Sequence, residues 1–190
     1  MSDSSITKKA LADALKKLMK KEGFDRVSVS DICNSCGMNR KSFYYHFRDK
    51  YDLVNWVFYE DLIDRLSVAD YENGWDMLYD ICSKFYEDRV FYAEAFRIEG
   101  QDSFRSYVLE TLRPMASFFL EGIFPDRDEE DYFFRYFGEA GLFAVMSWLR
   151  DDEDMTPEEF VENLRKVFCR LAAAVTEEKR YGEPSSLSRR

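Results

Sequence analysis

Residues 28–47 have the sequence SVSDICNSCGMNRKSFYYHF, which predicts two short helices joined by a tight turn. Ser28 can cap the first helix, and Asp31 places a negative charge in its first turn, where the helix dipole favours it. Gly37 provides backbone freedom for the turn, and Asn39 can cap the second helix. The stretch therefore predicts a helix-turn-helix, whose second helix enters the major groove of DNA.

The second helix of this motif is apolar on one side and polar or cationic on the other. Phe43 and Phe47 are four residues apart, so we expect both to face the core. The outward side chains are donors and cations suited to base edges and phosphates. They are Asn39, Arg40, Lys41, Ser42, Tyr44, Tyr45 and His46. For Tyr44 and Tyr45, packing within the protein is the alternative to DNA contact.

Charge is divided unevenly along the chain. The 190 residues carry a net charge of −10, yet residues 1–50 contain 11 Lys or Arg against six Asp or Glu. Only the surface that meets phosphate must be positive, and an acidic body would favour one docking orientation. On charge alone, a helical protein with an uneven surface remains the alternative.

Cys33 and Cys36 form a CxxC pattern that can indicate redox or zinc chemistry. A second pair is lacking, and His46 is the only histidine in the chain. Both thiols also fall where the first helix of the motif must pack closely on its neighbour. We interpret them as structural residues, with a redox or metal role as the alternative, and we expect no cofactor.

The remaining sequence has a helical period and no convincing strand pattern. Caps and apolar stripes predict helices over residues 5–22, 49–67, 75–89, 91–98, 102–122, 129–150 and 157–180. We therefore expect an all-α protein with a three-helix helix-turn-helix domain in residues 1–50. A helical ligand-binding and dimerisation domain would occupy residues 51–182, followed by a disordered tail, 183–190. No apolar run reaches transmembrane length and no signal peptide is present, so we expect a cytoplasmic protein without membrane partners.

Aromatic residues are concentrated in the second domain, with 27 of 32 after residue 50. This density predicts either a pocket for an apolar or flat ligand, or a filled aromatic core. The candidate pocket residues are Trp75, Tyr79, Phe85, Tyr86, Phe96, Phe104, Tyr107 and Phe118.

The last two predicted helices carry apolar stripes with small residues that allow another helix to approach closely. These stripes predict a four-helix dimer interface, with intramolecular core as the alternative. The candidate interface residues are Phe133, Phe137, Gly141, Ala144, Val145, Trp148, Phe160, Leu164, Val167, Phe168 and Leu171. A twofold dimer is expected because one short recognition helix reads too few base pairs for useful specificity.

The N-terminal pattern resembles the TetR/AcrR family of bacterial transcription regulators over residues 5–66. The residues at the family's spacing are Val29, Asp31, Ile32, Gly37, Phe43, Tyr44, His46, Phe47 and Lys50. Cys36 replaces a common alanine, and Asn39-Arg40-Lys41 replaces the more usual Ser-x-Gly, which leaves the base preference open. Residues 39–56 and 94–104 are similar to the subgroup of dihydroxyacetone-kinase regulators.

The resemblance implies a dimeric regulator, expected to be a repressor, that binds a palindromic operator in double-stranded DNA. Arg40 or Lys41 would contact guanine, and Asn39 would contact adenine. The phosphate contacts would come from Ser28, Ser30, Tyr44, His46 and Lys50. The effector in the C-terminal domain would be a small molecule; the alternative is an interaction module or co-activator controlled by a partner protein. Helix 49–67 would transmit the signal, and no catalytic motif is present, so no enzyme is expected.

Overall fold

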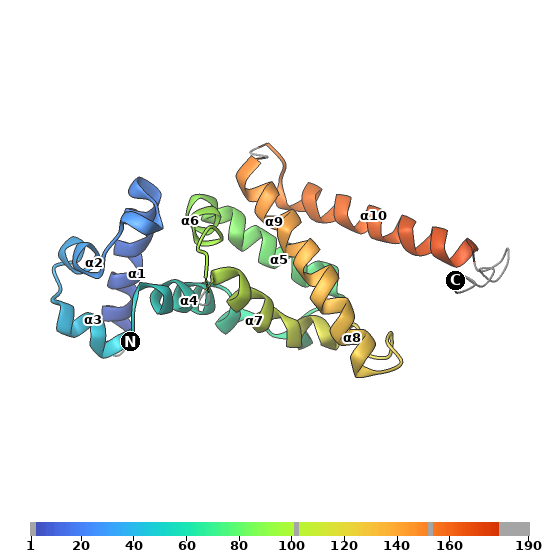
Figure 1. The fold of residues 1–190 in the computed structure, drawn as a ribbon, viewed down its shortest axis with the longest axis horizontal. Coiled ribbons are helices and arrows are strands. Elements are labelled where there is room, and N and C mark those ends of the chain that lie inside the picture. The colour runs from blue at the N-terminus through green and yellow to red at the C-terminus, as the bar shows by residue number, and fades with distance from the viewer. Residues whose placement is uncertain (1–2, 101–102, 152–153, 179–190) are drawn as a thin grey trace, which may run out of the picture.

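The computed structural model describes residues 3–100, 103–151 and 154–178, and within these ranges the protein is all-α (Figure 1). This confirms the predicted fold class. The elements are α1 (Asp3–Glu22), η1 (Phe24–Arg26), α2 (Val29–Ser35), α3 (Arg40–His46), α4 (Lys50–Asp61), η2 (Ile63–Arg65), η3 (Val68–Asp70), α5 (Gly74–Glu87), α6 (Arg89–Ala95), α7 (Phe104–Phe119), α8 (Arg127–Phe133), η4 (Phe134–Gly138), α9 (Glu139–Asp151) and α10 (Pro157–Glu178). The tail expected over residues 183–190 lies outside the described ranges.

Helices α1, α2 and α3 form an N-terminal unit around a shared apolar core (Figure 1). Leu11 and Leu15 of α1 are fully buried, as are Ile32 of α2 and Phe43 of α3. Truncating a buried phenylalanine to alanine typically costs about 3–5 kcal/mol, so Phe43 is a principal anchor of α3. The predicted inward orientation of Phe43 is confirmed.

The helix predicted over residues 49–67 is wrong at its C-terminal end. Asp49 caps α4 by accepting a hydrogen bond from the Asp52 amide at 2.8 Å, but the helix ends at Asp61. Leu62 leaves the helical region with φ −123° and ψ −65°, and the 3₁₀ turn η2 follows. The tighter turn lets the adjacent Leu62 and Ile63 both reach the core before the chain turns towards α5.

Helices α5 to α10 form the body, whose core is filled by aromatic rings. Phe85 lies at its centre, with ring centroids of Tyr92 and Phe96 at 4.8 and 5.4 Å. Phe104 packs against Phe96 at 4.9 Å and against Phe58 of α4 at 5.6 Å. The body is thereby connected to α4 by aromatic packing.

The helix predicted over residues 129–150 begins earlier and is interrupted. Asp126 caps α8 by accepting from the Glu129 amide at 3.0 Å, so the helix begins at Arg127. Five residues, Phe134–Gly138, then form a π-helical turn that leads directly into α9. A π turn places one additional residue within a continuous helix.

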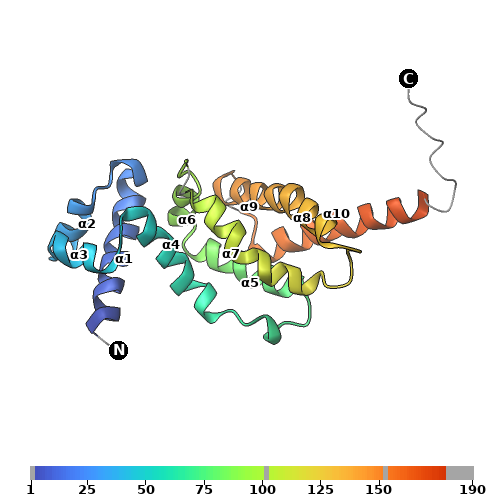
Figure 2. The same cartoon turned by 60° about the horizontal axis from the view of Figure 1, so that its bottom comes forward.

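The C-terminal helix α10 packs along α5 through its first half and projects from the body beyond it (Figure 2). The Thr156–Glu159 capping box starts this helix, since each side chain accepts a hydrogen bond from the other residue's backbone amide. Among the described residues, no helix is both long and apolar enough to cross a membrane.

Candidate nucleic-acid interface

The starts of α2 and α3 are fixed by local hydrogen bonds, and the turn between them depends on a glycine. The Ser28 hydroxyl accepts from the Asp31 amide, and the Asp31 carboxylate accepts from the Ser28 amide at 3.0 Å, which is the predicted capping. These bonds from Ser28 hold the pKa of Asp31 below its ordinary value. Gly37 takes φ +70°, a conformation that a side chain would strain. Asn39 caps α3, its side-chain oxygen accepting from the Ser42 amide at 2.8 Å.

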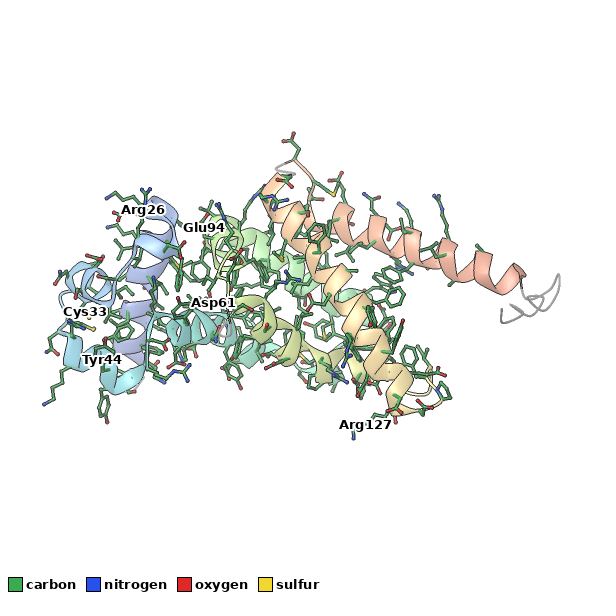
Figure 3. All side chains as sticks on the ribbon, in the orientation of Figure 1. Arg26, Cys33, Tyr44, Asp61, Glu94 and Arg127 are labelled. Atoms are coloured by element: carbon green, nitrogen blue, oxygen red, sulfur yellow. The ribbon has the colours of Figure 1, made fainter. Side chains whose placement is uncertain are left out.

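The outward face of α3 presents aromatic and cationic side chains to solvent. Tyr45 is 83% exposed, which excludes the packing alternative for its side chain. Tyr44 is 50% exposed and points away from the body (Figure 3), while its ring edge contacts Phe43. Arg40 donates to the Tyr44 hydroxyl at 3.4 Å, and this hydrogen bond raises the pKa of Arg40. Lys41 is exposed and has no ion pair with any residue that the structure describes.

The remaining predicted contacts around α3 are partly engaged within the protein. The Asn39 side-chain oxygen serves the cap, so only its amide nitrogen is left for a base, whereas paired recognition of adenine uses both atoms. The Ser42 hydroxyl also donates to Asn39, and the Ser28 hydroxyl donates to Asp31. Ser30 and His46 are half-buried, and the His46 ring lies at 4.9 Å from that of Tyr45.

Lys50 has a different position from the one that was predicted. Its ammonium donates to the carbonyl oxygens of Phe24 at 2.8 Å and Val27 at 2.9 Å. It also lies 4.0 Å from the centre of the Phe24 ring, and burial lowers the pKa of Lys50. We therefore correct the phosphate assignment of Lys50: two of its three donors are used to attach α4 to η1.

Cys33 and Cys36 are placed as structural residues. Cys33 is buried, and burial raises the pKa of its thiol, which disfavours the thiolate that metal binding or redox chemistry needs. The half-buried Cys36 thiol donates to the Ile32 carbonyl at 3.3 Å. Among the described residues, no cluster of His, Cys, Asp and Glu has an arrangement that could hold a metal ion.

The candidate ligand pocket is not assembled as predicted. Phe85 and Phe104 are buried in the filled core, whereas Tyr79 and Phe118 are exposed at the surface. A cleft of about 1350 Å³ instead separates the end of α1 and η1 from α6, the start of α7 and α9. Of the candidate pocket residues, only Phe96 lines it, so Trp75, Tyr86 and Tyr107 also lie outside it. Sequence reasoning missed the cleft because its walls are formed by charged residues from distant segments.

Part of the candidate dimer interface is buried within the protomer. Trp148 stacks on Phe160 with centroids 4.5 Å apart, and its indole N–H donates to the Met155 carbonyl at 2.9 Å. Val145 is also buried, so for these three residues the intramolecular alternative is correct. The other candidates are half-buried or exposed, and they comprise Phe133, Phe137, Gly141, Ala144, Leu164, Val167, Phe168 and Leu171.

The same surface includes exposed aromatic residues that sequence reasoning missed. The rings of Tyr132 and Tyr136, both exposed on α8 and η4, lie with centroids 4.5 Å apart in a tilted arrangement, and Phe143 is exposed on α9. Together with Phe137, they make the outward side of this continuous helix unusually aromatic. The four-residue spacing of Tyr132 and Tyr136 was the available signal.

Comparison with known proteins decides the family. Residues 11–57 match the family of bacterial regulatory proteins of the tetR type. Residues 72–169, about half of the chain, match a TetR transcriptional regulator C-terminal region. The chain belongs to the TetR family. It is therefore a DNA-binding transcriptional regulator and not an enzyme.

Individual relatives agree with this assignment and with the DhaS-like subgroup. The chain is similar to the HTH-type dhaKLM operon transcriptional activator DhaS of Lactococcus lactis subsp. lactis (strain IL1403), with 30% identity over 100 residues. That similarity spans 52% of this chain and 54% of the relative, about half of each. The solved structure of a dihydroxyacetone kinase operon activator DhaS has 25% identity and a TM-score of 0.54, covering 95% of this chain and 99% of that one.

A third comparison concerns the fold alone. NalD, described as the secondary repressor of the MexAB-OprM multidrug efflux pump in Pseudomonas aeruginosa, superposes with a TM-score of 0.63 at 18% identity. The superposition covers 90% of this chain and 97% of the NalD chain. The similarity of fold thus extends across both the N-terminal unit and the body.

Proposed function

We propose that this TetR-family regulator binds a palindromic operator as a homodimer, with α3 of each protomer in the major groove. The observation that carries the proposal is the composition of α3. Its inward side is anchored by buried Phe43 and Phe47, and its outward side presents Arg40, Lys41 and Tyr45. A short helix fixed from behind and cationic in front suits the reading of base edges.

Different side chains would have different roles in this complex. Arg40 and Lys41, at the start of α3, would donate to guanine edges, and Tyr44 would contact phosphate while holding Arg40. Further contacts to the sugar-phosphate backbone of the DNA would come from Tyr45, His46 and Ser30. The side chains of Asn39, Ser42 and Ser28 would act chiefly through the caps that orient the two helices.

Dimerisation would use the outward side of α8, η4 and α9 together with the projecting part of α10. On α10, Val167 and Leu171 are more than half exposed and four residues apart, and Phe168 adjoins them. Such a stripe, left uncovered in one protomer, is the side that a second helix would bury. Two copies of each helix would then form a four-helix interface.

We further propose that the protein activates transcription, in place of the repression expected from the sequence. Support comes from the similarity to DhaS, which is described as an operon activator. The regulated genes would belong to an operon of the dihydroxyacetone-kinase type. We place an effector site in the cleft between the N-terminal unit and the body, because an occupant there would touch both.

Two linked experiments test this proposal. Purified protein is mixed with fragmented genomic DNA at about 0.15 M salt, and the bound fragments are sequenced. The expected result is a short palindrome upstream of a few genes, and a reporter under that promoter should lose expression when the regulator is deleted. Recovery of no shared sequence would contradict operator binding, and increased reporter expression would contradict activation.

A further inference from the structure

Asp88 occupies the cap position of α6 but does not use its carboxylate to cap the helix. The carboxylate points instead to α1, with Lys20 Nζ at 2.7 Å and Lys16 Nζ at 3.2 Å. An aspartate at a helix start ordinarily accepts from the first free amides, so this side chain forgoes a local stabilising bond for a contact with the N-terminal unit.

A second carboxylate approaches the same lysine from α4. Asp61, the last residue of α4, accepts a hydrogen bond from Lys16, and the Lys16 ammonium lies 5.4 Å from the centre of the Phe91 ring. Burial by itself lowers the pKa of Lys16, but Asp61 and Asp88 raise it on balance. We call Lys16, Lys20, Asp61 and Asp88 the Lys16 cluster; it joins α1, α4 and α6 at one point.

The Lys16 cluster lies beside the cleft that separates the N-terminal unit from the body. Arg26 and Glu94, labelled in Figure 3, belong to the two walls of this cleft. Contact across it is close at Gly23, where an added Cβ would lie 3.2 Å from Glu94 Oε2. The ion pairs of the cluster are direct contacts of α1 with α4 and with α6 beside this cleft.

Helix α6 is also attached to the opposite side of the body. Arg89, the residue after Asp88, donates from Nε to the Leu149 carbonyl of α9 at 2.9 Å. Helix α9 belongs to the proposed dimer surface. Adjacent residues at the start of α6 thus connect the dimer helix with the helix that supports α2 and α3.

We propose that Asp88 is a positioning residue for operator binding: through Lys16 and Lys20 it fixes the N-terminal unit relative to the dimer helices. The inference rests on the proposed function, since only a dimer has two recognition helices to space. Each added base pair moves a half-site by about 3.4 Å and rotates it by about 35°. A regulator whose N-terminal units are held at a fixed angle to the dimer helices should therefore discriminate strongly between operator spacings.

The test uses the full-length protein and duplexes made from the selected palindrome. One duplex keeps the original spacing, two differ by one base pair in either direction, and one holds a single half-site. The variants are Asp88→Asn and, as a matched control, Glu87→Gln, which removes the exposed Lys84–Glu87 pair within α5. Circular dichroism and thermal unfolding establish that each variant is folded.

The wild type and Glu87→Gln should prefer the original spacing, and Asp88→Asn should lose that preference by about fivefold or more. Half-site affinity should stay within about twofold, because Asp88 is not proposed to touch DNA. Should Asp88→Asn fail to fold, Lys20→Met is judged by the same criterion, since its side chain is nearly half exposed.

Two outcomes overturn the inference and can be told apart. A folded variant that keeps the wild-type spacing preference refutes the positioning role of Asp88 and leaves the proposed function standing. A wild type that binds the half-site and the palindrome equally well refutes the dimeric operator complex, and the positioning role falls with it.

Discussion

The ammonium of Lys50 donates to the Phe24 carbonyl and lies over the ring of the same residue, at 2.8 and 4.0 Å. One lysine thereby holds the end of the N-terminal core against the start of α4. A cation placed in this way stabilises the fold, and it is largely withdrawn from DNA.

Replacing Lys50 by methionine should lower the free energy of unfolding by about 1–3 kcal/mol, because two part-buried, charge-assisted hydrogen bonds to carbonyl oxygens are lost. Urea denaturation measures this change. Lys41→Met is the control: it should leave the unfolding curve unchanged and reduce the salt dependence of DNA binding. If Lys50→Met instead left the unfolding curve unchanged and reduced the salt dependence of DNA binding, Lys50 would be a phosphate contact after all.

Arg40→Ala should relax base preference at one position of each half-site, by about 1–3 kcal/mol. The Tyr44→Phe variant keeps the ring and removes only the hydroxyl to which Arg40 donates, so its effect should be smaller and in the same direction. Binding to a library of single-base operator variants gives both values. Equal affinity of Arg40→Ala and wild type for every variant would exclude Arg40 from base recognition.

Leu171→Glu should convert the dimer to monomer at micromolar concentration, because it places a charge within the exposed stripe of α10. Light scattering coupled to size exclusion measures the mass. The control is Arg165→Glu, which changes an exposed residue of α10 outside the stripe and should leave the mass of the dimer unchanged. A Leu171→Glu protein that remains dimeric would move the interface away from this part of α10.

Acid should weaken the start of α2 through Asp31. Its pKa is held below the ordinary value of 3.8 by hydrogen bonds from Ser28. The stabilisation is therefore present above pH 3.8 and lost as pH falls through the lower folded pKa. Asp31→Asn should be less stable than wild type at pH 6, and the two unfolding midpoints should approach each other as pH falls below 3.8 through the folded pKa. A constant difference across this range would assign the effect to another group.

Tyr92→Phe should leave the melting temperature unchanged or raise it, even though the side chain is completely buried. Its hydroxyl has no hydrogen-bond partner among the described atoms, so removing it relieves an unsatisfied group. Burial, and then the charges of Asp61 and Asp88, raise the pKa of Tyr92, which keeps it neutral. Differential scanning calorimetry decides the matter, and a clear loss of stability would reveal a partner for this hydroxyl.

The sequence predicted the N-terminal unit well because its signals are local. Ser28, Asp31 and Asn39 act on amides three residues away, and Gly37 acts on its own turn. Apolar stripes predicted the helices of the body but could not distinguish contacts within one protomer from contacts between two. Trp148 and Phe160 were assigned to a partner for this reason.

Contacts between distant segments could not be predicted in the same way. Lys16 and Asp61 are 45 residues apart, and each is an ordinary charged residue on its own helix. The same applies to the carbonyl contacts of Lys50, whose spacing matches a family pattern that suggests phosphate binding. Only the packing of α4 against η1 directs its ammonium inward.

The π turn at Phe134–Gly138 makes α8 and α9 a single helical rod that contains one additional residue at the turn. Each residue of an α-helix advances the side-chain direction by about 100°, but the π turn absorbs one additional residue without adding that rotation between the two ends of the rod. Deleting one residue here would let the rod close into regular α-helix while Leu142 stays buried. Tyr132 and Phe143 would then keep their present relative orientation, whereas a one-residue deletion within regular α-helix would rotate one relative to the other by about 100°.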